Sequence, residues 1–293
     1  MSGTTGFVGQ HLAQRLTQEN HDIYALIRPT ANLDYFEKHK IKFFIFDGTI
    51  TNLISFMQTH HFDGVIHLAS RFLAQHKPED IKDLIDSNVL FATTLLEAAV
   101  LSHVPWFINT GTFWQHYEDK EYSPVNLYAA SKQTFEAMAQ YYYETSPINF
   151  VTIKLCDTFG PSDIRPKVFN LWAKISQTQE ELAMSAGEQL IDISYIDNVI
   201  DGYCQLVQLL ADDKDRTMVG QSFAIMADER LTLKQLAELF EKTTKIRLPI
   251  AWGQRPYRPR EVMIPWTKGQ RIPGWRPKIT LKEGIKRTFY EKR

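Results

Sequence analysis

Five short apolar segments separated by helical stretches constrain the fold of this chain most strongly. They are residues Asp22–Ile27, Lys42–Phe46, Gly64–Leu68, Trp106–Asn109 and Asn149–Leu155. Runs such as Phe43-Phe44-Ile45-Phe46 have no polar face, as expected for strands that are covered on both sides. Helical patterns lie between the segments, near residues 9–18, 80–102 and 127–144. This alternation predicts an α/β fold, in which helices wrap a doubly wound parallel sheet.

A glycine-rich turn stands at the start of the sequence. Gly3-Thr4-Thr5-Gly6-Phe7-Val8-Gly9 opens the first helical stretch. Glycines at this spacing permit a tight turn and a close approach of the backbone to a pyrophosphate at a helix N-terminus, although a plain turn before a helix shows the same spacing. The motif predicts a sheet of the Rossmann type and a dinucleotide cofactor held by Gly3, Gly6, Phe7, Val8 and Gly9.

Only Met1 and Ser2 precede this turn, where a buried strand is expected. Either the sheet lacks its first, central strand, or the chain begins downstream of its true start. We therefore expect the first strand to be missing. Our hypothesis is a truncated or mis-assigned N-terminus, which the intact mass of the native protein would test.

Two residues at strand ends bear on which dinucleotide binds. Arg28 follows the segment Asp22–Ile27, where a carboxylate would bind the ribose hydroxyls of NAD. An arginine there suits the 2′-phosphate of NADP, so NADP is favoured over NAD unless Arg28 is simply solvated. Asp47 ends the next strand and has two open roles. It would accept a hydrogen bond from the adenine amino group, or it would cap the helix that starts near Thr49.

A tyrosine and a lysine four residues apart indicate the chemistry. In Tyr128-Ala129-Ala130-Ser131-Lys132 the first and last side chains share one helix face. We expect the ammonium to lower the tyrosine pKa from about 10, so that the phenol exchanges a proton with a hydroxyl or ketone. Thr110 follows the strand Trp106–Asn109, and its hydroxyl would hold the reacting oxygen. In isolation, Thr110 would be read as a turn or cap residue.

These motifs occur in the order typical of a known family. After the glycine turn come His67-Leu68-Ala69-Ser70, Asn88-Val89, Thr110, Tyr128 with Lys132, Phe159-Gly160-Pro161, Gly187-Glu188-Gln189 and Tyr195-Ile196-Asp197. Over nearly its whole length the chain resembles the NAD-dependent epimerase/dehydratase family, which comprises extended short-chain dehydrogenases/reductases that act on nucleotide sugars. Within that family, Asn109-Thr110 and Gly274-Trp275-Arg276-Pro277 are similar to the CDP-abequose and CDP-paratose synthases.

The resemblance implies a role for each matching residue. Tyr128 would donate or accept the proton, and Lys132 would lower the tyrosine pKa and hold the nicotinamide ribose. Thr110 would bind the C4 oxygen, with Thr112 as its substitute, and Asn88 would support the active-site helix. The segment beneath the cofactor would comprise His67, Leu68, Ala69 and Ser70. Apart from the resemblance, His67 is typical of a packing residue at a strand end.

Two departures from the family pattern narrow the reaction. Dehydratases of the family carry acidic residues directly after the catalytic threonine, whereas this chain has Gly111 and Thr112 there. A 4,6-dehydratase is therefore not expected. Ile191 stands where many relatives have an arginine before the aspartate, here Asp192, so one expected phosphate contact is lost.

After residue 158 prolines and basic residues become frequent and the regular alternation ends. We expect residues 1–158 with 192–222 to form the dinucleotide-binding domain, and residues 159–191 with 223–293 to form a smaller nucleotide-sugar-binding lobe. Ile193–Leu210 would return to the main sheet as a strand and a helix. The favoured ligands of the substrate diphosphate are Lys167 and Arg258, ahead of Arg165, Arg255 and Arg260, although basic residues of this kind also occur in solvated loops.

The composition argues against several partners. Lysine and arginine total 33 against 34 aspartates and glutamates, a net charge of -1 that does not favour nucleic acid. The two cysteines have no metal-type spacing, so neither a metal site nor a disulfide is expected. The sequence has no recognisable signal peptide, long apolar span or basic amphipathic arm. We expect a cytoplasmic protein that does not bind membranes.

Together these features predict an enzyme that uses NADPH to reduce a 4-keto-6-deoxy or 4-keto-3,6-dideoxy nucleotide sugar. A C4 epimerase that retains NAD is the nearest alternative, and Arg28 argues modestly against it. A non-catalytic regulator that binds a dinucleotide is a third reading. The resemblance also implies a homodimer formed through the active-site helices, while the sugar stereochemistry and the nucleotide base stay open.

Overall fold

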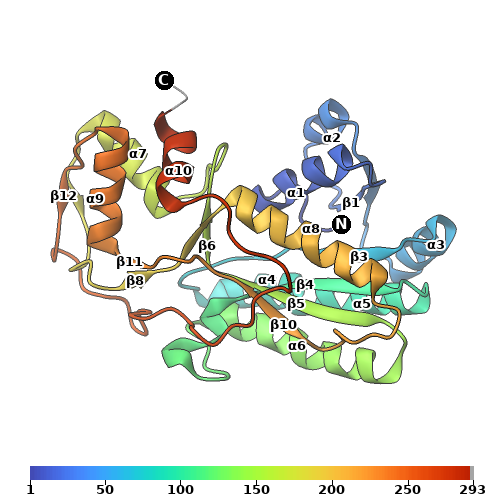
Figure 1. The fold of residues 1–293 in the computed structure, drawn as a ribbon. Coiled ribbons are helices and arrows are strands. Elements are labelled where there is room, and N and C mark those ends of the chain that lie inside the picture. Colours follow the sequence, from blue (N-terminus) through green and yellow to red (C-terminus); the bar gives the residue numbers. More distant parts are fainter. Residues whose placement is uncertain (291–293) are drawn as a thin grey trace.

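A parallel sheet forms the centre of the protein, of which the computed structural model describes residues 1–290 (Figure 1). In spatial order its strands are β2 (Lys42–Ile45), β1 (Tyr24–Ile27), β3 (Gly64–His67), β4 (Trp106–Thr112), β5 (Asn149–Leu155) and β10 (Ser222–Ile225). Hydrogen-bonded neighbours among these strands run parallel. The five strands predicted from the apolar segments are therefore confirmed, and β10 is added at one edge.

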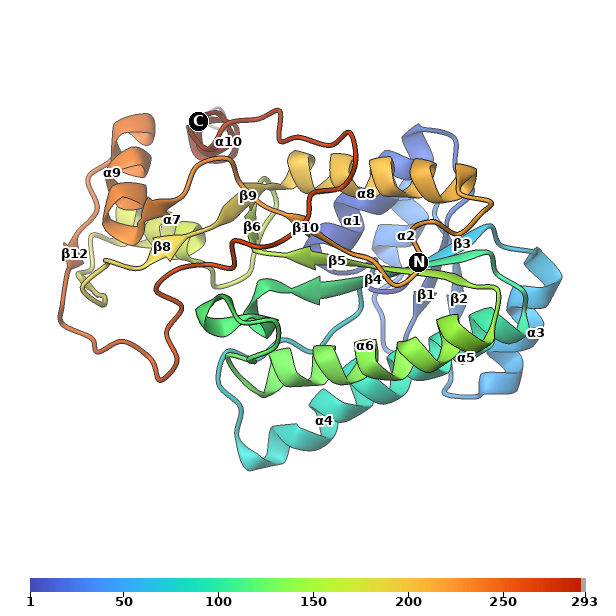
Figure 2. The same cartoon turned by 60° about the horizontal axis from the view of Figure 1, so that its bottom comes forward.

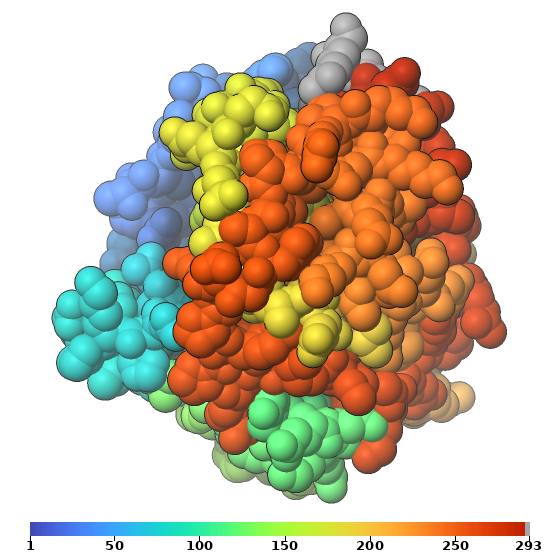
Figure 3. All heavy atoms as spheres, turned by 90° about the vertical axis from the view of Figure 1, so that its left-hand side faces the viewer, coloured from blue at the N-terminus to red at the C-terminus, as the bar shows by residue number. Residues whose placement is uncertain are grey.

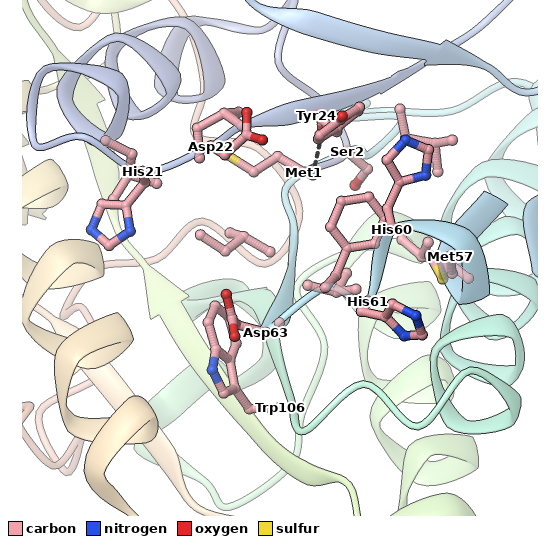
Figure 4. A pocket seen from close by; sticks show the side chains of 18 of the residues that line it. Met1, Ser2, His21, Asp22, Tyr24, Met57, His60, His61, Asp63 and Trp106 are labelled. Atoms are coloured by element: carbon pink, nitrogen blue, oxygen red, sulfur yellow. Dashed lines mark hydrogen bonds between the residues drawn. The ribbon is translucent and has the colours of Figure 1, made fainter.

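Met1 and Ser2 occupy the place of the first strand, which we expected to be missing. Ser2 forms parallel bridges to Leu26 of β1 and to His67 of β3, and so joins the two parts of the sheet. The Met1 ammonium donates a hydrogen bond to the carbonyl oxygen of Tyr24 at 2.7 Å. Beside Met1, a cavity of about 330 Å³ opens between the starts of β1 and β3 (Figure 4). No strand precedes α1 among the described residues, as expected, and the two bridges of Ser2 hold the start of the glycine turn against the sheet.

Helices cover both faces of the sheet (Figure 2). On one face lie α1 (Phe7–Gln18), α2 (Asp34–His39) and α8 (Ile196–Asp212), and on the other lie α3 (Ile50–His60), α5 (Phe91–Leu101) and α6 (Leu127–Thr145). Successive side chains of a strand point to opposite faces, so Phe107 and Ile108 of β4 enter two different apolar cores. The predicted helices near residues 9–18 and 127–144 are confirmed as α1 and α6.

The helix predicted near residues 80–102 is a continuous segment of α4 (Ile81–Ile85), a π-helical turn (Asp86–Leu90) and α5. From Pro78 to Leu101 the chain is long and apolar enough to cross a membrane by length and composition, with a mean hydropathy of 1.5. However, Leu95 and Leu96 of α5 are buried in one of the two sheet cores. The core helix of a folded domain passes the same test, so this segment is weak evidence for a membrane span.

A smaller lobe lies at the carboxyl ends of the central strands (Figure 1). Its helices are α7 (Val168–Thr178), α9 (Leu233–Thr244) and α10 (Leu281–Ile285). Its short strands pair two by two: β6 (Asp157–Phe159) with β9 (Ile193–Tyr195), β8 (Leu190–Ile191) with β11 (Leu231–Thr232), and β7 (Leu182–Ala183) with β12 (Ile250–Ala251).

The structure corrects two details of the predicted division. Residues 223–225, which we placed in the lobe, belong to β10 and pair with β5 in the main sheet. β9 does not return to that sheet, because the adjacent β6 supplies its hydrogen-bonding partner. The helix that follows, α8, does return and packs beside α1. The remaining boundaries of the two-part division stay a prediction.

The lobe meets the loops that follow β3 and β4. Figure 3 views the lobe from outside and shows its C-terminal segment, in orange and red, beside the cyan segment after β3 and the green segment after β4. Ligands of parallel sheets bind outside the carboxyl ends of the strands. We therefore expect the ligand-binding site at the junction between these loops and the lobe.

Candidate active site

The glycine turn fits a pyrophosphate. Gly3 has a φ of +75°, and a side chain on it would lie 2.5 Å from the amide nitrogen of Ala69. A side chain on Gly9 would lie 2.1 Å from the carbonyl oxygen of Gly3. α1 begins after Gly6 with no side-chain cap from the described residues, so its first amide groups are available to an anion. The residues predicted to bind the cofactor here are thus brought together at one helix N-terminus.

The two predicted adenosine contacts are exposed at the ends of β1 and β2. Arg28 directly follows β1. Asp47 accepts hydrogen bonds from the Thr49 amide at 2.8 Å and from the Asn52 side chain at 3.2 Å. These bonds, foremost that from the Thr49 backbone, lower the pKa of Asp47. Asp47 thus binds the backbone just before α3 but is not its N-cap, which is Thr49, and the adenine contact of Asp47 stays a prediction.

Asn88 connects the loop after β3 to the helix that carries Tyr128. Its side chain is fully buried in the π-helical turn. Asn88 Oδ1 accepts hydrogen bonds from Ser70 Oγ at 3.0 Å and from the Arg71 amide at 2.7 Å, and Nδ2 donates to Ser131 Oγ at 2.9 Å. The Ser131 hydroxyl in turn donates to the carbonyl oxygen of Tyr128 at 2.7 Å. This geometry matches the supporting role predicted for Asn88.

His67 is placed as a packing residue. Its Nδ1 shares a hydrogen bond of 2.7 Å with Ser2 Oγ, and its ring contacts three phenylalanine rings. Burial lowers the pKa of His67 well below its ordinary value, and the nearby Lys132 ammonium lowers it further, so the ring is neutral. Leu68 and Ala69 continue from it to the close contact with the glycine turn.

Tyr128 lies in the first turn of α6, beside the loop after β3. Asn126 caps this helix by accepting a hydrogen bond from the Ala129 amide at 3.0 Å. Its Nδ2 donates to the carbonyl oxygens of Leu73 and Ala74 at 3.1 and 3.0 Å. The loop and the helix are therefore held as one unit at the point where Tyr128 emerges.

Tyr128 is a neutral phenol in this environment. Burial raises its pKa to about 12, although hydrogen bonds with Ser70 and Thr112 oppose the increase. The ring of Phe72 meets the tyrosine ring edge-on, with centroids 5.0 Å apart. The decrease that we expected from Lys132 is wrong here, because the loss of water around a phenolate outweighs the favourable contacts. Tyr128 can therefore donate a proton.

Lys132 follows Tyr128 by one helical turn, as predicted, and is 1% exposed. Burial lowers the pKa of Lys132 to about 8, while the Glu136 carboxylate, one further turn along α6, opposes the decrease. The ammonium is therefore the main form at neutral pH, and it is lost within the range of an ordinary activity assay.

The hydroxyl beside Tyr128 belongs to Thr112, and the placement predicted for Thr110 is wrong. Thr110 Oγ1 is hydrogen-bonded to the hydroxyl of Tyr203 on α8 at 2.7 Å. Thr112 is buried beside Tyr128, and its hydroxyl acts to lower the Tyr128 pKa. The physical reason is the length of β4, which stays paired with β5 as far as Thr112 opposite Leu155. The hydroxyl at the end of the strand therefore belongs to a residue two positions further along the chain than predicted. That residue is Thr112, which we named as the substitute for Thr110.

A smaller cavity of about 80 Å³ opens beside Thr112. Its lining includes the aromatic side chains Phe113, Trp114 and Trp266 and the carboxylates Asp157, Asp192 and Glu261. Each carboxylate has a cationic partner: Lys167 at 2.8 Å from Asp157, Arg230 at 2.8 Å from Asp192, and Arg258 at 2.9 Å from Glu261. Within residues 1–290 no group of three His, Cys, Asp or Glu side chains is arranged to hold a metal ion.

The two favoured substrate ligands both lie near this cavity. The Lys167 ammonium is 4.6 Å from the Phe72 ring centroid, and the Arg258 guanidinium is 5.7 Å from that of Trp114. Of the less favoured basic residues, Arg165 binds Asp163 at 2.8 Å and Arg260 donates to Ser123 Oγ at 2.7 Å.

Sequence reasoning missed the acidic partners of these cations. Asp157 comes soon after the end of β5, and a polar residue after a buried parallel strand is a signal that we did not use. Glu261 stands in an irregular segment with no periodic pattern, so the sequence offers no comparable signal for it.

Comparisons with known proteins support the resemblance found in the sequence. The family model described as the NAD dependent epimerase/dehydratase family matches residues 1–220. CDP-abequose synthase from Salmonella muenchen is 26% identical over 292 residues, which cover 98% of this chain and 95% of that protein. UDP-glucuronate 4-epimerase from Thermodesulfobacterium geofontis is 24% identical, with coverage of 98% and 94%.

Solved structures share the fold. UDP-glucose 4-epimerase from Thermotoga maritima, with UDP-glucose, superposes with a TM-score of 0.82 at 19% identity, covering 99% of this chain and 97% of that one. A point mutant of UDP-glucuronic acid 4-epimerase from Bacillus cereus, in complex with NAD and a UDP-4-deoxy-4-fluoro-glucuronic acid, gives 0.83 at 20% identity, with coverage of 99% and 96%. This likeness confirms the predicted Rossmann-type fold.

Proposed function

Because this chain belongs to the NAD dependent epimerase/dehydratase family, we propose that it reduces a 4-keto-deoxy nucleotide sugar with NADPH. The predicted family is confirmed, and so is the class of protein. The chain is an NAD(P)-dependent enzyme of nucleotide-sugar conversion, of the short-chain dehydrogenase/reductase type. The proposal concerns the reaction, the substrate and the choice of cofactor.

One observation carries the proposed reaction: a neutral phenol lies beside Thr112, and each carboxylate that lines the adjacent cavity is paired with a cation. The two residues after Thr112 are Phe113 and Trp114, so the acids that dehydratases carry after the threonine are absent here too. The carboxylates that line the cavity are all paired with lysine or arginine. Loss of water from a sugar needs an acid and a base, whereas reduction of a ketone needs one proton donor. Tyr128 supplies that donor.

Each active-site residue then has a defined task. Bound NADPH would supply the hydride that converts the C4 ketone into an alcohol. Tyr128 donates its proton to the C4 oxygen as negative charge develops there, and Lys132 stabilises the phenolate that remains. Thr112 Oγ1 accepts a hydrogen bond from the Trp114 amide at 3.3 Å, so its hydroxyl hydrogen is available to the same C4 oxygen.

The cavity wall supports a deoxygenated sugar as the substrate. Besides its aromatic side chains, it includes Leu155, Leu190, Ile191, Val262 and Pro265. A sugar hydroxyl that loses its water against such a surface without gaining a partner costs about 1–3 kcal/mol. A 6-deoxy or 3,6-dideoxy sugar has fewer hydroxyls that would have to give up bound water at this wall. The similarity to CDP-abequose synthases also favours a deoxygenated sugar as the substrate.

NADPH is proposed ahead of NADH because of Arg28. Its exposed side chain follows β1, where it can pair with a 2′-phosphate. The solved relatives named above include one with NAD, so NAD stays the second choice. Comparison of the two reduced cofactors in one assay decides between them.

The test of the proposed function is Tyr128→Phe, assayed with NADPH and CDP-, GDP-, UDP- and dTDP-linked 4-keto-6-deoxy and 4-keto-3,6-dideoxy sugars. We expect kcat to fall by about 100-fold or more, because the proton donor is lost. Binding of NADPH, followed by its fluorescence, should be retained. Tyr122→Phe is the matched control, since Tyr122 is an exposed tyrosine whose change should leave kcat unaltered. Turnover near the native value in the Tyr128 variant would overturn the mechanism.

A 4-epimerase is the second candidate, because a UDP-glucuronate 4-epimerase matches almost the whole chain at 24% identity. Such an enzyme would be purified with tightly bound NAD and would consume no NADPH. A reductase would consume one NADPH for each sugar reduced. Spectroscopy of the purified protein therefore separates the two.

We also propose that the protein works in the cytoplasm as a homodimer formed through the helices that flank the active site. The outer surface of the π-helical turn, α5 and α6 carries large apolar side chains, namely Leu90, Leu101, Met138 and Tyr141, which are 60%, 47%, 41% and 67% exposed. Covering these side chains with a second copy would remove apolar surface from water. Sedimentation at several protein concentrations tests this arrangement.

A further inference from the structure

A buried charged cluster lies beside the active site, and none of the proposed catalytic steps uses it. Lys154 of β5 is 5% exposed, and its Nζ lies 2.8 Å from His116 Nε2 and 3.5 Å from Glu136 Oε2. Burial, aided by the Lys154 charge, lowers the pKa of His116 to about 4, so this ring is neutral. Its Nδ1 lies 3.1 Å from the Lys120 carbonyl oxygen and must carry the proton, which leaves Nε2 to accept from Lys154.

Glu136 links this cluster to two parts of the site. Its Oε1 accepts a hydrogen bond from Gln115 Nε2 at 3.0 Å, and Gln115 Oε1 accepts one from the Thr112 amide at 2.9 Å. Gln115 is fully buried. On α6, Glu136 follows Lys132 by four residues, as Lys132 follows Tyr128, so these three side chains share one helix face.

The cluster is packed tightly against β4. A side chain on Gly111 would lie 2.9 Å from Gln115 Oε1, 2.9 Å from Glu136 Oε1 and 3.0 Å from Lys154 Cγ. These polar side chains therefore fill the space next to the residue that precedes Thr112. Their contacts leave the end of β4 little freedom to shift.

We propose that Glu136 is a positioning residue of the active site, which stabilises the Lys132 ammonium from one turn further along α6 and links the strand end carrying Thr112 to Lys154 in the core. The kinetic part of this inference rests on the proposed function. The electrostatic part does not, because the protonation of Lys132 can be followed without turnover.

The charged and titratable groups around Lys132 define the sign of the effect. His67, from β3, and Tyr128, on the same helix, are both neutral. The Glu136 carboxylate raises the pKa of Lys132 against the effect of burial. Behind Glu136 stand Lys154 from β5 and the neutral His116. Removal of the Glu136 charge should therefore make Lys132 lose its proton at a lower pH.

Glu136→Gln tests this link, because the amide keeps the shape and an oxygen for Gln115 but removes the charge. NMR of protein labelled with [ε-13C]lysine, with Lys132→Met to assign the signal, follows the titration. We expect it to move from about pH 8 to lower pH by about one unit. The alkaline limb of the kcat profile should move with it, with little change in KM. Glu144→Gln, an exposed change on the same helix, should alter neither.

Gln115→Met tests the second link while the charge stays in place. We expect kcat to fall by about tenfold with little change in KM, since Thr112 loses its fixed position, and the Lys132 titration to stay where it is. This variant keeps the inference open to refutation if the Glu136 variant does not fold. Glu136 is only a structural residue if its variant lowers the melting temperature but moves neither the titration nor the alkaline limb. In that case the inference fails, whether or not the native protein reduces any of the sugars.

Discussion

Two threonines of β4 differ by two positions, and this difference decides which hydroxyl lies beside Tyr128 in the proposed active site. Side chains two residues apart on a strand are separated by about 6–7 Å, which is more than a hydrogen bond can span. Thr110 is the inner one and is bound to Tyr203, while Thr112 reaches Tyr128. Both are threonines at a strand end, so the sequence alone does not distinguish them.

The two threonines should respond in opposite ways to the same change. Thr112→Val should lower kcat by about 100-fold, because it removes the donor to the C4 oxygen. Thr110→Val should leave kcat within about threefold but cost about 1 kcal/mol of folding free energy, since the buried Tyr203 hydroxyl loses its partner. Steady-state kinetics and thermal unfolding of both variants check this. A larger kcat loss for Thr110→Val would restore our original assignment.

Lys132 should set the alkaline limit of the activity. Its pKa is lowered from 10.5 to about 8, whereas Tyr128 keeps its proton up to about 12. As the pH rises through 8, the ammonium that stabilises the phenolate is lost while the proton donor stays intact. We expect kcat to fall by about tenfold per pH unit above pH 8, measured between pH 6 and 10. If kcat instead begins to fall only near pH 10, Lys132 is not buried as described.

At the scale of elements, the strands and their helices could be predicted from mainly apolar runs, although the cover on both faces expected for β2 is wrong, because β2 lies at the sheet edge and Ile45 is 44% exposed. The end of β4 could not, because Thr110-Gly111-Thr112 is polar and owes its strand conformation to pairing with β5. The two-residue strands of the lobe have no pattern of their own for the same reason. Propensity describes a segment by itself, whereas these segments take their conformation from their neighbours.

The same distinction holds for the candidate site. The spacing of Tyr128 and Lys132 is local, since both lie on one helix, and their common face was predictable. The contacts of Gln115, Glu136 and Lys154 join residues far apart in the sequence, so only the folded chain reveals them. The direction of the Tyr128 pKa shift also depends on how deeply the folded chain buries the phenol, and the sequence motif does not reveal this depth.

The buried amino group of Met1 should give the folding stability a distinctive pH dependence. Burial lowers the pKa of the Met1 ammonium from 8.0 to about 5. Between pH 5 and 8 the unfolded chain therefore binds a proton that the folded chain does not, so the free energy of unfolding rises with pH across this window. The contribution is about 4 kcal/mol at most. Urea unfolding at pH 5, 6, 7 and 8 measures it.

An N-terminal extension provides the matched comparison. Val-Leu-Val-Ile placed before Met1 would continue the strand into the cavity of about 330 Å³ and turn the ammonium into an amide. We expect a higher melting temperature and a smaller rise in stability between pH 5 and 8. Gly-Ser-Gly-Ser at the same place removes the charge from Met1 but fills little of the cavity, so its melting temperature should be lower. Equal melting temperatures would mean that the cavity does not accept a strand.

At the scale of the whole molecule, the proposed substrate site uses two cations from separate segments of the lobe. Lys167 precedes α7, and Arg258 lies beyond β12, and each is held by a carboxylate near the cavity. A diphosphate must compete with these carboxylates, and it gains two charge-assisted contacts only if both cations reach it. The affinity for a diphosphate therefore shows whether Lys167 and Arg258 contact the same ligand.

This arrangement predicts how a nucleoside diphosphate will bind. CDP should raise the melting temperature in proportion to its occupancy, and the effect should weaken with added salt. Lys167→Met and Arg258→Met should each weaken CDP binding by about tenfold, as expected for the loss of one charged hydrogen-bond donor. Lys174→Met, an exposed change on α7, serves as the control and should leave binding unaltered. If either variant binds CDP as tightly as the native protein, that cation does not contact the diphosphate, and the substrate must lie elsewhere in the cleft.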